Sequence, residues 1–284
     1  MGRSKRIYDL LLSVWPLYKV GLWMGMQPGI GNLLNPFFSS KIHQVTMIPM
    51  NETINQGDQI VLPYSLLMQL VGQASARFIM TECVCRSHEI CQSHPINLGC
   101  LFLGDGAAQI HTSLGRLCDI EEAKTHIQQG AENGLFPLIA HTMIDAFTLG
   151  IPYKRMLTVC FCCECCCVVH RGMRRGPASL MQVVQRLPGL RVRVGSECED
   201  CGDCIETCPV GAISLNHRGA EISDECKGCG ICVNTCPYGA ISMEMEGKMD
   251  LLAGFNERMK SYADISVQRT GSSSRRAKKS ILKP

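Results

Sequence analysis

The chain has 284 residues, of which 19 are cysteines; 46% are hydrophobic, 19% are charged, and the formal net charge is +3. This length can bury a substantial core and suits two domains of about 100–200 residues each. Secreted modules held by disulfides are short, and the first twenty residues lack the pattern of a signal peptide, so a disulfide framework is disfavoured. We expect a cytoplasmic protein whose thiols bind metal.

The first 62 residues form an apolar segment without cysteine. Asp9, Pro16 and Lys19 interrupt its apolar run, which argues against a membrane-spanning helix. We expect this segment to dock on a partner subunit or on the protein's own core, or to lie as an amphipathic anchor on the inner face of the membrane. The residues that recur there at helical spacing are Ile7, Leu10, Leu11, Val14, Tyr18, Gly21 and Leu22.

Eleven cysteines lie between positions 83 and 167, and ten of them are candidate metal ligands. Cys118 stands alone between two groups, which is more typical of a buried apolar residue. The nearby histidines His88, His94, His111 and His170 are more typical of structural roles than of ligation. The ten candidates are Cys83, Cys85, Cys91, Cys100, Cys160, Cys162, Cys163, Cys165, Cys166 and Cys167.

Six of these cysteines fall in the eight residues "CFCCECCC", positions 160–167. Neighbouring side chains point about 100° apart on a helix and to opposite faces of a strand, so six cannot reach one metal together. The preceding "YKRMLTV" predicts a strand, which places the cysteines in a loop at its end. Such a loop either feeds two centres or leaves some thiols free. Ten thiols suit two further clusters, one larger centre, a structural zinc or redox-active dithiols.

Helical segments are predicted around these cysteines. The pattern favours a helix over 64–80, leading to Cys83, and a second helix that Asp119 and Glu122 cap and Gly134 ends. After the cysteines, the arginine-rich linker 171–192 contains "PASLMQVVQRLP", which predicts a short docked helix.

The strongest signal is an internal repeat. The pattern C-x2-C-x2-C-x3-C-P begins at Cys198 and again at Cys226, an offset of 28 residues. "AISL" and "AISME" follow the two copies and predict short strands. Zinc ligands usually come as two distant C-x2-C pairs, so a pair of zinc sites is the weaker interpretation.

This spacing resembles that of bacterial-type ferredoxins, in which the fourth cysteine of each run binds the other cluster. The resemblance implies an α+β fold with two [4Fe–4S] clusters. By the same resemblance, one cluster is held by Cys198, Cys201, Cys204 and Cys236, and the other by Cys226, Cys229, Cys232 and Cys208.

The cysteine-rich half is similar to iron–sulfur proteins of anaerobic bacteria in which such a domain precedes a two-cluster ferredoxin. The stretches that carry the similarity are "CVCR", "LGCLFLGDGA", "EEA" and "CFCCECCC". Similar sequences have Asn where this chain has Phe161. The similarity implies one or two further iron–sulfur clusters without assigning individual ligands.

We therefore expect a multi-cluster electron-transfer protein, a subunit of a larger oxidoreductase complex, with redox protein partners and no nucleic acid. The alternatives are a reductase with an open-site cluster in the Cys-rich domain, and a redox sensor or assembly scaffold. The predicted regions are an N-terminal segment (1–62), a Cys-rich metal-binding domain (63–170), a basic linker (171–192), a ferredoxin domain (193–247) and a basic, flexible tail (248–284).

Overall fold

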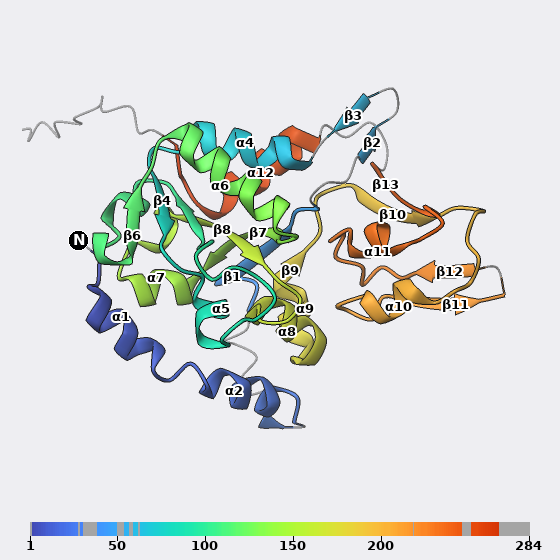
Figure 1. Ribbon diagram of the computed structural model, residues 1–284, viewed down its shortest axis with the longest axis horizontal. Coiled ribbons are helices and arrows are strands. Elements are labelled where there is room, and N and C mark those ends of the chain that lie inside the picture. Colours follow the sequence, from blue (N-terminus) through green and yellow to red (C-terminus); the bar gives the residue numbers. More distant parts are fainter. Residues whose placement is uncertain are drawn as a thin grey trace, which may run out of the picture.

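The structure is a computed structural model that describes residues 2–27, 29–30, 39–49, 54–56, 59–61, 63–217, 219–245 and 251–266. The chain folds into a larger main unit and a smaller C-terminal unit that projects from it (Figure 1). Both units combine helices and strands, which confirms the expected α+β class.

A seven-stranded sheet forms the centre of the main unit. Neighbouring strands are antiparallel except for one parallel pair at an edge, β1 and β9. In spatial order the strands are β6 (Gly115–Leu117), β4 (Arg77–Met80), β5 (Leu101–Leu103), β8 (Leu157–Cys162), β7 (Phe136–Thr142), β1 (His43–Met47) and β9 (Val184–Gln185). The N-terminal segment thus supplies a strand of this sheet, and Tyr8 and Leu12 of its first helix pack in the core of the main unit.

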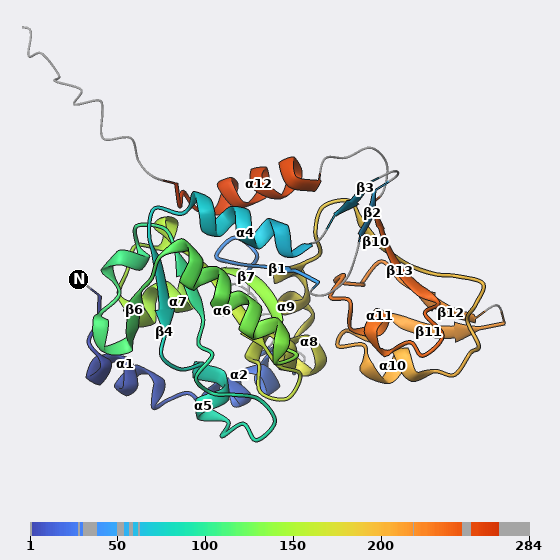
Figure 2. The ribbon, with the colours of Figure 1, turned by 45° about the horizontal axis from the view of Figure 1, so that its top comes forward.

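Helices cover both faces of the sheet. One face packs against α4 (Pro63–Gln73), α6 (Ile120–Glu132) and α12 (Leu251–Tyr262), and Figure 2 shows α12 lying along α4. The other face packs against α1 (Lys5–Leu12) and α7 (Met143–Leu149). The remaining helices of this unit are α2 (Leu17–Gly25), α5 (Val84–His88), α8 (Val168–Arg175), α9 (Ala178–Val183) and 3-10 turns at Ala107–Gln109, Thr112–Leu114 and Tyr153–Arg155.

The expected helix over 64–80 is too long. The helix α4 ends at Gln73, and residues 77–80 form the strand β4. Phe78 and Ile79 lie in separate apolar clusters on the two faces of the sheet, so this run is apolar on both sides and its helical periodicity is misleading. By contrast, the helix after Asp119 is confirmed, with both hydrogen bonds of the capping box present.

The expected flexible tail is also wrong in part. Residues 251–262 form α12, whose Phe255 and Met259 are almost fully buried in the core of the main unit. The tail beyond residue 266, with most of its basic residues, lies outside the described residues. The docked helix in the linker is shorter than expected, because residues 184–185 pair with β1.

The C-terminal unit contains the two copies of the repeat. Its short helices α10 (Asp203–Thr207) and α11 (Ile231–Thr235) occupy equivalent positions in the two copies. The expected strands after the copies are confirmed as β11 (Ile213–Asn216) and β13 (Ile241–Met245). The other strands are β10 (Leu190–Val194), β12 (Gly219–Ile222), β2 (Ile54–Gln56) and β3 (Gln59–Val61). The pair β2–β3 extends the sheet of β10 and β13.

Within the described residues, no helix is long and apolar enough to cross a membrane.

Candidate metal centres

The ten candidate cysteines of the main unit divide into two groups. One group, which we call the six-thiol site, surrounds the start of two helices. In it, the Sγ atoms of Cys162 and Cys167 lie 3.1 Å apart, and those of Cys100 and Cys160 lie 3.6 Å apart. Further thiol hydrogen bonds join the group into one network. Its members are Cys83, Cys85, Cys100, Cys160, Cys162 and Cys167.

The six-thiol site favours thiolates at selected positions. The helix α5 begins after Cys83 and α8 begins after Cys167, so both residues lie at electropositive helix N-termini. Hydrogen bonds from the thiols of Cys162 and Cys85 lower the pKa of Cys167 to about 5. Hydrogen bonds with Cys160 and Cys167 raise the pKa of Cys162. The network can therefore present thiolates, which are the ligands of iron–sulfur clusters.

The second group, which we call the four-thiol site, consists of Cys91, Cys163, Cys165 and Cys166. All four Sγ atoms lie within 4.8 Å of one another, and those of Cys91 and Cys165 are 3.7 Å apart. Burial opposes ionisation of Cys91, but backbone N–H groups and the neighbouring thiols outweigh it and lower its pKa to about 7.

The strand β8 explains how "CFCCECCC" serves both sites. Successive side chains of a strand point to opposite faces, so Cys160 and Cys162 share one face and reach the six-thiol site. Phe161 points to the other face, where its ring packs edge-to-face on His126 at 5.1 Å. The strand ends at Cys162, the following turn supplies the four-thiol site, and Cys167 returns to the six-thiol site.

Arg86 lies between the two groups and was not singled out from the sequence, although it is the last residue of "CVCR". Its side chain is 1% exposed, and its guanidinium donates to the backbone oxygens of Pro95 (2.8 Å), Phe161 (2.6 Å) and Leu98. Although burial acts against its charge, nearby thiols of both groups raise the pKa of Arg86. A buried cation with three backbone acceptors stabilises thiolates on either side.

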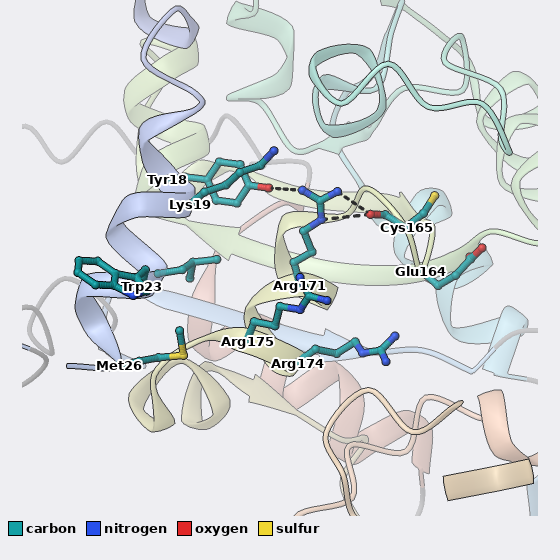
Figure 3. Close-up of a pocket in the computed structure, with 10 residues that line it drawn as sticks. Tyr18, Lys19, Trp23, Met26, Glu164, Cys165, Arg171, Arg174 and Arg175 are labelled. Carbon is teal, nitrogen blue, oxygen red and sulfur yellow. Dashed lines mark hydrogen bonds between the residues drawn. The ribbon is translucent and has the colours of Figure 1, made fainter. Parts of the chain in front are cut away.

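Arg171 holds the four-thiol turn against the N-terminal helices (Figure 3). Its Nε and Nη2 donate to the oxygen of Cys165 at 3.1 and 2.9 Å. Its Nη1 donates to the hydroxyl of Tyr18 at 3.0 Å and pairs with Glu89 at 2.8 Å. Beside this network lies a cavity of about 560 Å³ whose walls include Trp23 and Arg174.

The other sequence candidates lie at the edges of these sites. His94 is 3.3 Å from the Glu164 carboxylate, and the two lie with Cys165 in a group of potential ligand atoms. His170 bonds the oxygen of Glu164 at 3.0 Å, and His111 caps a 3-10 turn. His88 contacts Trp15 and the oxygen of Val84, and Cys118 belongs to neither thiol group.

The C-terminal unit brings the eight repeat cysteines around two cavities. One cavity is lined by what we call the Cys198 set: Cys198, Cys201, Cys204 and Cys236. The other is lined by what we call the Cys226 set: Cys208, Cys226, Cys229 and Cys232. These are the two sets that the resemblance to ferredoxins implies, including the exchange of the fourth cysteine.

The backbone of each copy bends tightly around its cavity. Gly202 (φ 84°) and Gly230 (φ 82°) precede α10 and α11 in the left-handed region that favours glycine. Gly228 (φ 64°) corresponds to Asp200 (φ 53°) in the first copy, and Asp200 adopts the same left-handed backbone conformation although it is not a glycine. Several backbone N–H groups point at sulfur, such as that of Gly228, 3.4 Å from Cys226 Sγ.

The sequence comparison agrees with this geometry. Residues 197–240 match the family model of the 4Fe-4S dicluster domain. These residues form a ferredoxin-type domain. No curated protein matches the chain. With this domain and its further thiol groups, the chain is an iron–sulfur electron-transfer protein.

The two sets of the ferredoxin-type domain differ in their surroundings. Glu199, Asp200 and Asp203 line the cavity of the Cys198 set. Lys227 lines that of the Cys226 set and pairs with Glu225 at 3.8 Å, and Arg186 acts on Cys226. Burial raises the pKa of Cys229 to about 12, whereas Cys201 is exposed. The Cys198 set is therefore acidic and open, and the Cys226 set is more basic and enclosed.

The Cys226 set borders the main unit. Cys229 and Val210 pack against an apolar cluster that contains Cys162 and Cys167 of the six-thiol site. At Gly228 a β-carbon would come within 2.8 Å of Leu190, so the backbone there is pressed against the connection between the units. The ferredoxin-type domain and the six-thiol site thus share one apolar contact.

Proposed function

We propose that the chain is a multi-cluster electron-transfer protein that works as a subunit of a larger redox complex. The Cys198 set and the Cys226 set would each hold one [4Fe–4S] cluster, and the six-thiol site would hold a third iron–sulfur centre. Such clusters supply one-electron redox chemistry, and the chain sets their spacing, burial and electrostatic surroundings.

The observation that carries this proposal is that Cys229 packs against the apolar cluster to which Cys162 and Cys167 belong. It supports a row of thiol sites from the ferredoxin-type domain into the main unit. The exposed Cys201 at the other end of the domain suits contact with a redox protein partner. Electrons would enter there and pass inward.

The charges around the two sets support this direction. Acidic residues disfavour an added electron and lower a cluster's reduction potential, whereas nearby cations favour it and raise the potential. Because the Cys198 set has the acids and the Cys226 set has Lys227 and Arg186 nearby, we expect the lower potential at the Cys198 set. Electrons therefore move downhill toward the main unit.

The substitution Asp200→Gly tests this ordering. The Asp200 carboxylate lies 3.7 Å from Cys198 Sγ, and glycine is what the second copy has at this position, with a compatible backbone. Removing one exposed charge should raise the potential of the Cys198 cluster by about 10–40 mV and leave the other cluster unchanged. A potentiometric titration followed by EPR measures both potentials.

Glu132→Gln on α6 is the control, because it removes an exposed carboxylate from the main unit. It should move neither potential of the ferredoxin-type domain. Equal potentials in the unaltered chain, or a shift of the wrong cluster in Asp200→Gly, would contradict the proposed direction.

A peripheral contact with the inner face of the membrane is the second part of the proposal. The helices α1 and α2 and the turn between them expose large apolar side chains; Arg6 is exposed beside them, whereas Lys19 among them pairs with Glu89 at 3.0 Å. Such a face suits an anionic lipid surface. The exposed members are Ile7, Leu10, Val14, Leu17, Val20, Trp23, Met26 and Ile30.

The double substitution Leu10→Ser with Leu17→Ser should abolish most binding to phosphatidylglycerol vesicles in a sedimentation assay. Both side chains are exposed, at 71% and 62%, so folding should be unaffected. Leu117→Ser, at an exposed position of β6, is the control and should bind like the unaltered chain. If the unaltered chain stays in the supernatant at low salt, the exposed apolar side chains face a protein subunit instead of lipid.

A further inference from the structure

The four sulfurs of the four-thiol site are close enough to share a single ion. Zinc bonds cysteine sulfur at about 2.3 Å, so a regular tetrahedron of four sulfurs has edges of about 3.8 Å. The Cys91 and Cys165 sulfurs are 3.7 Å apart, and all four lie within 4.8 Å of one another. The structure describes all eight cysteines of the ferredoxin-type domain, and in neither set do three or more sulfurs lie within 4.8 Å of one another.

We propose that the four-thiol site binds one tetrahedral zinc ion through Cys91, Cys163, Cys165 and Cys166. A cubane needs room for an iron–sulfide core between its four thiolates, and the cysteines of each set of the ferredoxin-type domain surround a cavity and stay farther apart than those of the four-thiol site. The four-thiol site has no such room among its sulfurs. The proposal goes beyond electron transfer, because zinc has no redox chemistry in proteins.

The surroundings of the four-thiol site suit a closed structural ion. Cys163 is 1% exposed and Cys166 is 5% exposed, whereas Cys91 and Cys165 are half-buried, so the site is closed to solvent on the side of Cys163 and Cys166. Four thiolates around Zn²⁺ leave two negative charges, and the cations of Arg86 and Arg171 lie beside the site. Thiolates bind Zn²⁺ more tightly than Fe²⁺, which favours zinc over a single iron.

The neighbouring group His94, Glu164 and Cys165 offers a different set of ligand atoms. His94 Nδ1 bonds the oxygen of Asn133 at 3.2 Å and its Nε2 lies 3.3 Å from the Glu164 carboxylate, so both ring nitrogens have partners in the described structure. The four thiols are the softer and more buried donors. His94 and Glu164 then form a polar layer outside the ion.

A zinc ion here would tie the loop around Cys91 to the turn that follows β8. That turn leads to Cys167, so the ion would also fix one side of the six-thiol site. The cavity of about 560 Å³ beside Cys165 would then border a redox-inactive ion. This argues against the reductase alternative at that cavity.

The test is metal analysis and zinc X-ray absorption of the full chain, purified anaerobically and dialysed against EDTA. We expect one zinc per chain, with four sulfurs at about 2.3 Å. His94→Gln should keep the zinc and its four sulfurs, and Cys118→Ser should keep both as the control. Cys91→Ser should lose zinc at least tenfold faster to the chelator while the EPR signals of the ferredoxin-type domain persist.

Three results would overturn the proposal. The first is a chain without zinc, whether its site holds a cluster or a single iron. The second is zinc with a nitrogen or oxygen ligand, which would assign it to His94 or Glu164. The third is zinc that Cys91→Ser retains fully. If Cys91→Ser does not fold, the spectrum of the unaltered chain still decides, and the redox titration of the ferredoxin-type domain tests electron transfer separately.

Discussion

Replacing Arg86 with methionine is expected to lower the free energy of unfolding by about 3–5 kcal/mol and to deplete the metal content of the main unit. Methionine keeps the bulk of the side chain but leaves three backbone oxygens without their donor. It also removes the cation from between the two thiol groups. Denaturant unfolding under anaerobic conditions, followed by circular dichroism, measures the loss.

Two further variants separate charge from geometry. Arg86→Lys keeps the charge but has no planar fork to serve three acceptors, so it should recover only part of the stability. Arg77→Met is the matched control, because Arg77 also donates to backbone oxygens, at the end of α4, and is far less buried. It should cost less and leave the metal content intact. An Arg86→Met chain that is as stable and as metal-rich as the unaltered chain would contradict this role.

The ferredoxin-type domain was the most predictable part of the chain. Its ligands are close in sequence, and the fixed gaps between cysteines restrict the backbone around a cluster. The repeat offset of 28 residues recurs in the structure as equivalent helices and strands. Local chemistry also fixed the start of α6, because the capping box at Asp119 involves residues only three apart.

The grouping of the ten other cysteines could not be read from their spacing. It depends on the contact of Cys91 with Cys165 in the turn after β8 and on the contact of Cys100 with Cys160, which the antiparallel pairing of β5 and β8 brings together. Once β8 was recognised as ending inside "CFCCECCC", strand alternation would have separated Cys160 and Cys162 from Phe161. The role of Arg86 likewise depends on carbonyl groups up to 75 residues away.

Two other predictions failed because contacts between residues distant in the sequence decide the structure. The helix predicted to run to residue 80 stops earlier because β4 is paired on both sides. The tail was expected to be flexible from its charge, yet Phe255 and Met259 bury themselves against α4 and the sheet. In both segments, tertiary packing outweighs the local pattern.

Two matched variants with serine substitutions within "CFCCECCC" should lose different metals. Cys162→Ser with Cys167→Ser removes the closest pair of the six-thiol site, whose Sγ atoms are 3.1 Å apart. Together with Cys160→Ser, which leaves three of the six thiols, it should remove the iron of that centre, about four atoms for a cubane, and leave the zinc. Cys163→Ser with Cys165→Ser should remove the zinc and leave the iron, although the cysteines changed in the two variants are only a residue or two apart.

The quantities to measure are iron, zinc and acid-labile sulfide per chain. The ferredoxin-type domain should keep about eight irons in both variants and serves as the internal reference. The third substitution matters at the six-thiol site, because six thiols exceed the four that one cubane needs and a double variant would still have four. If both variants lose the same iron and sulfide, the ten thiols serve one shared centre, and the division made by β8 has no chemical meaning. If one variant loses only iron and the other loses only zinc, the cysteines of this short stretch serve two separate sites, a redox centre and a structural ion, because their side chains alternate in direction at the end of β8.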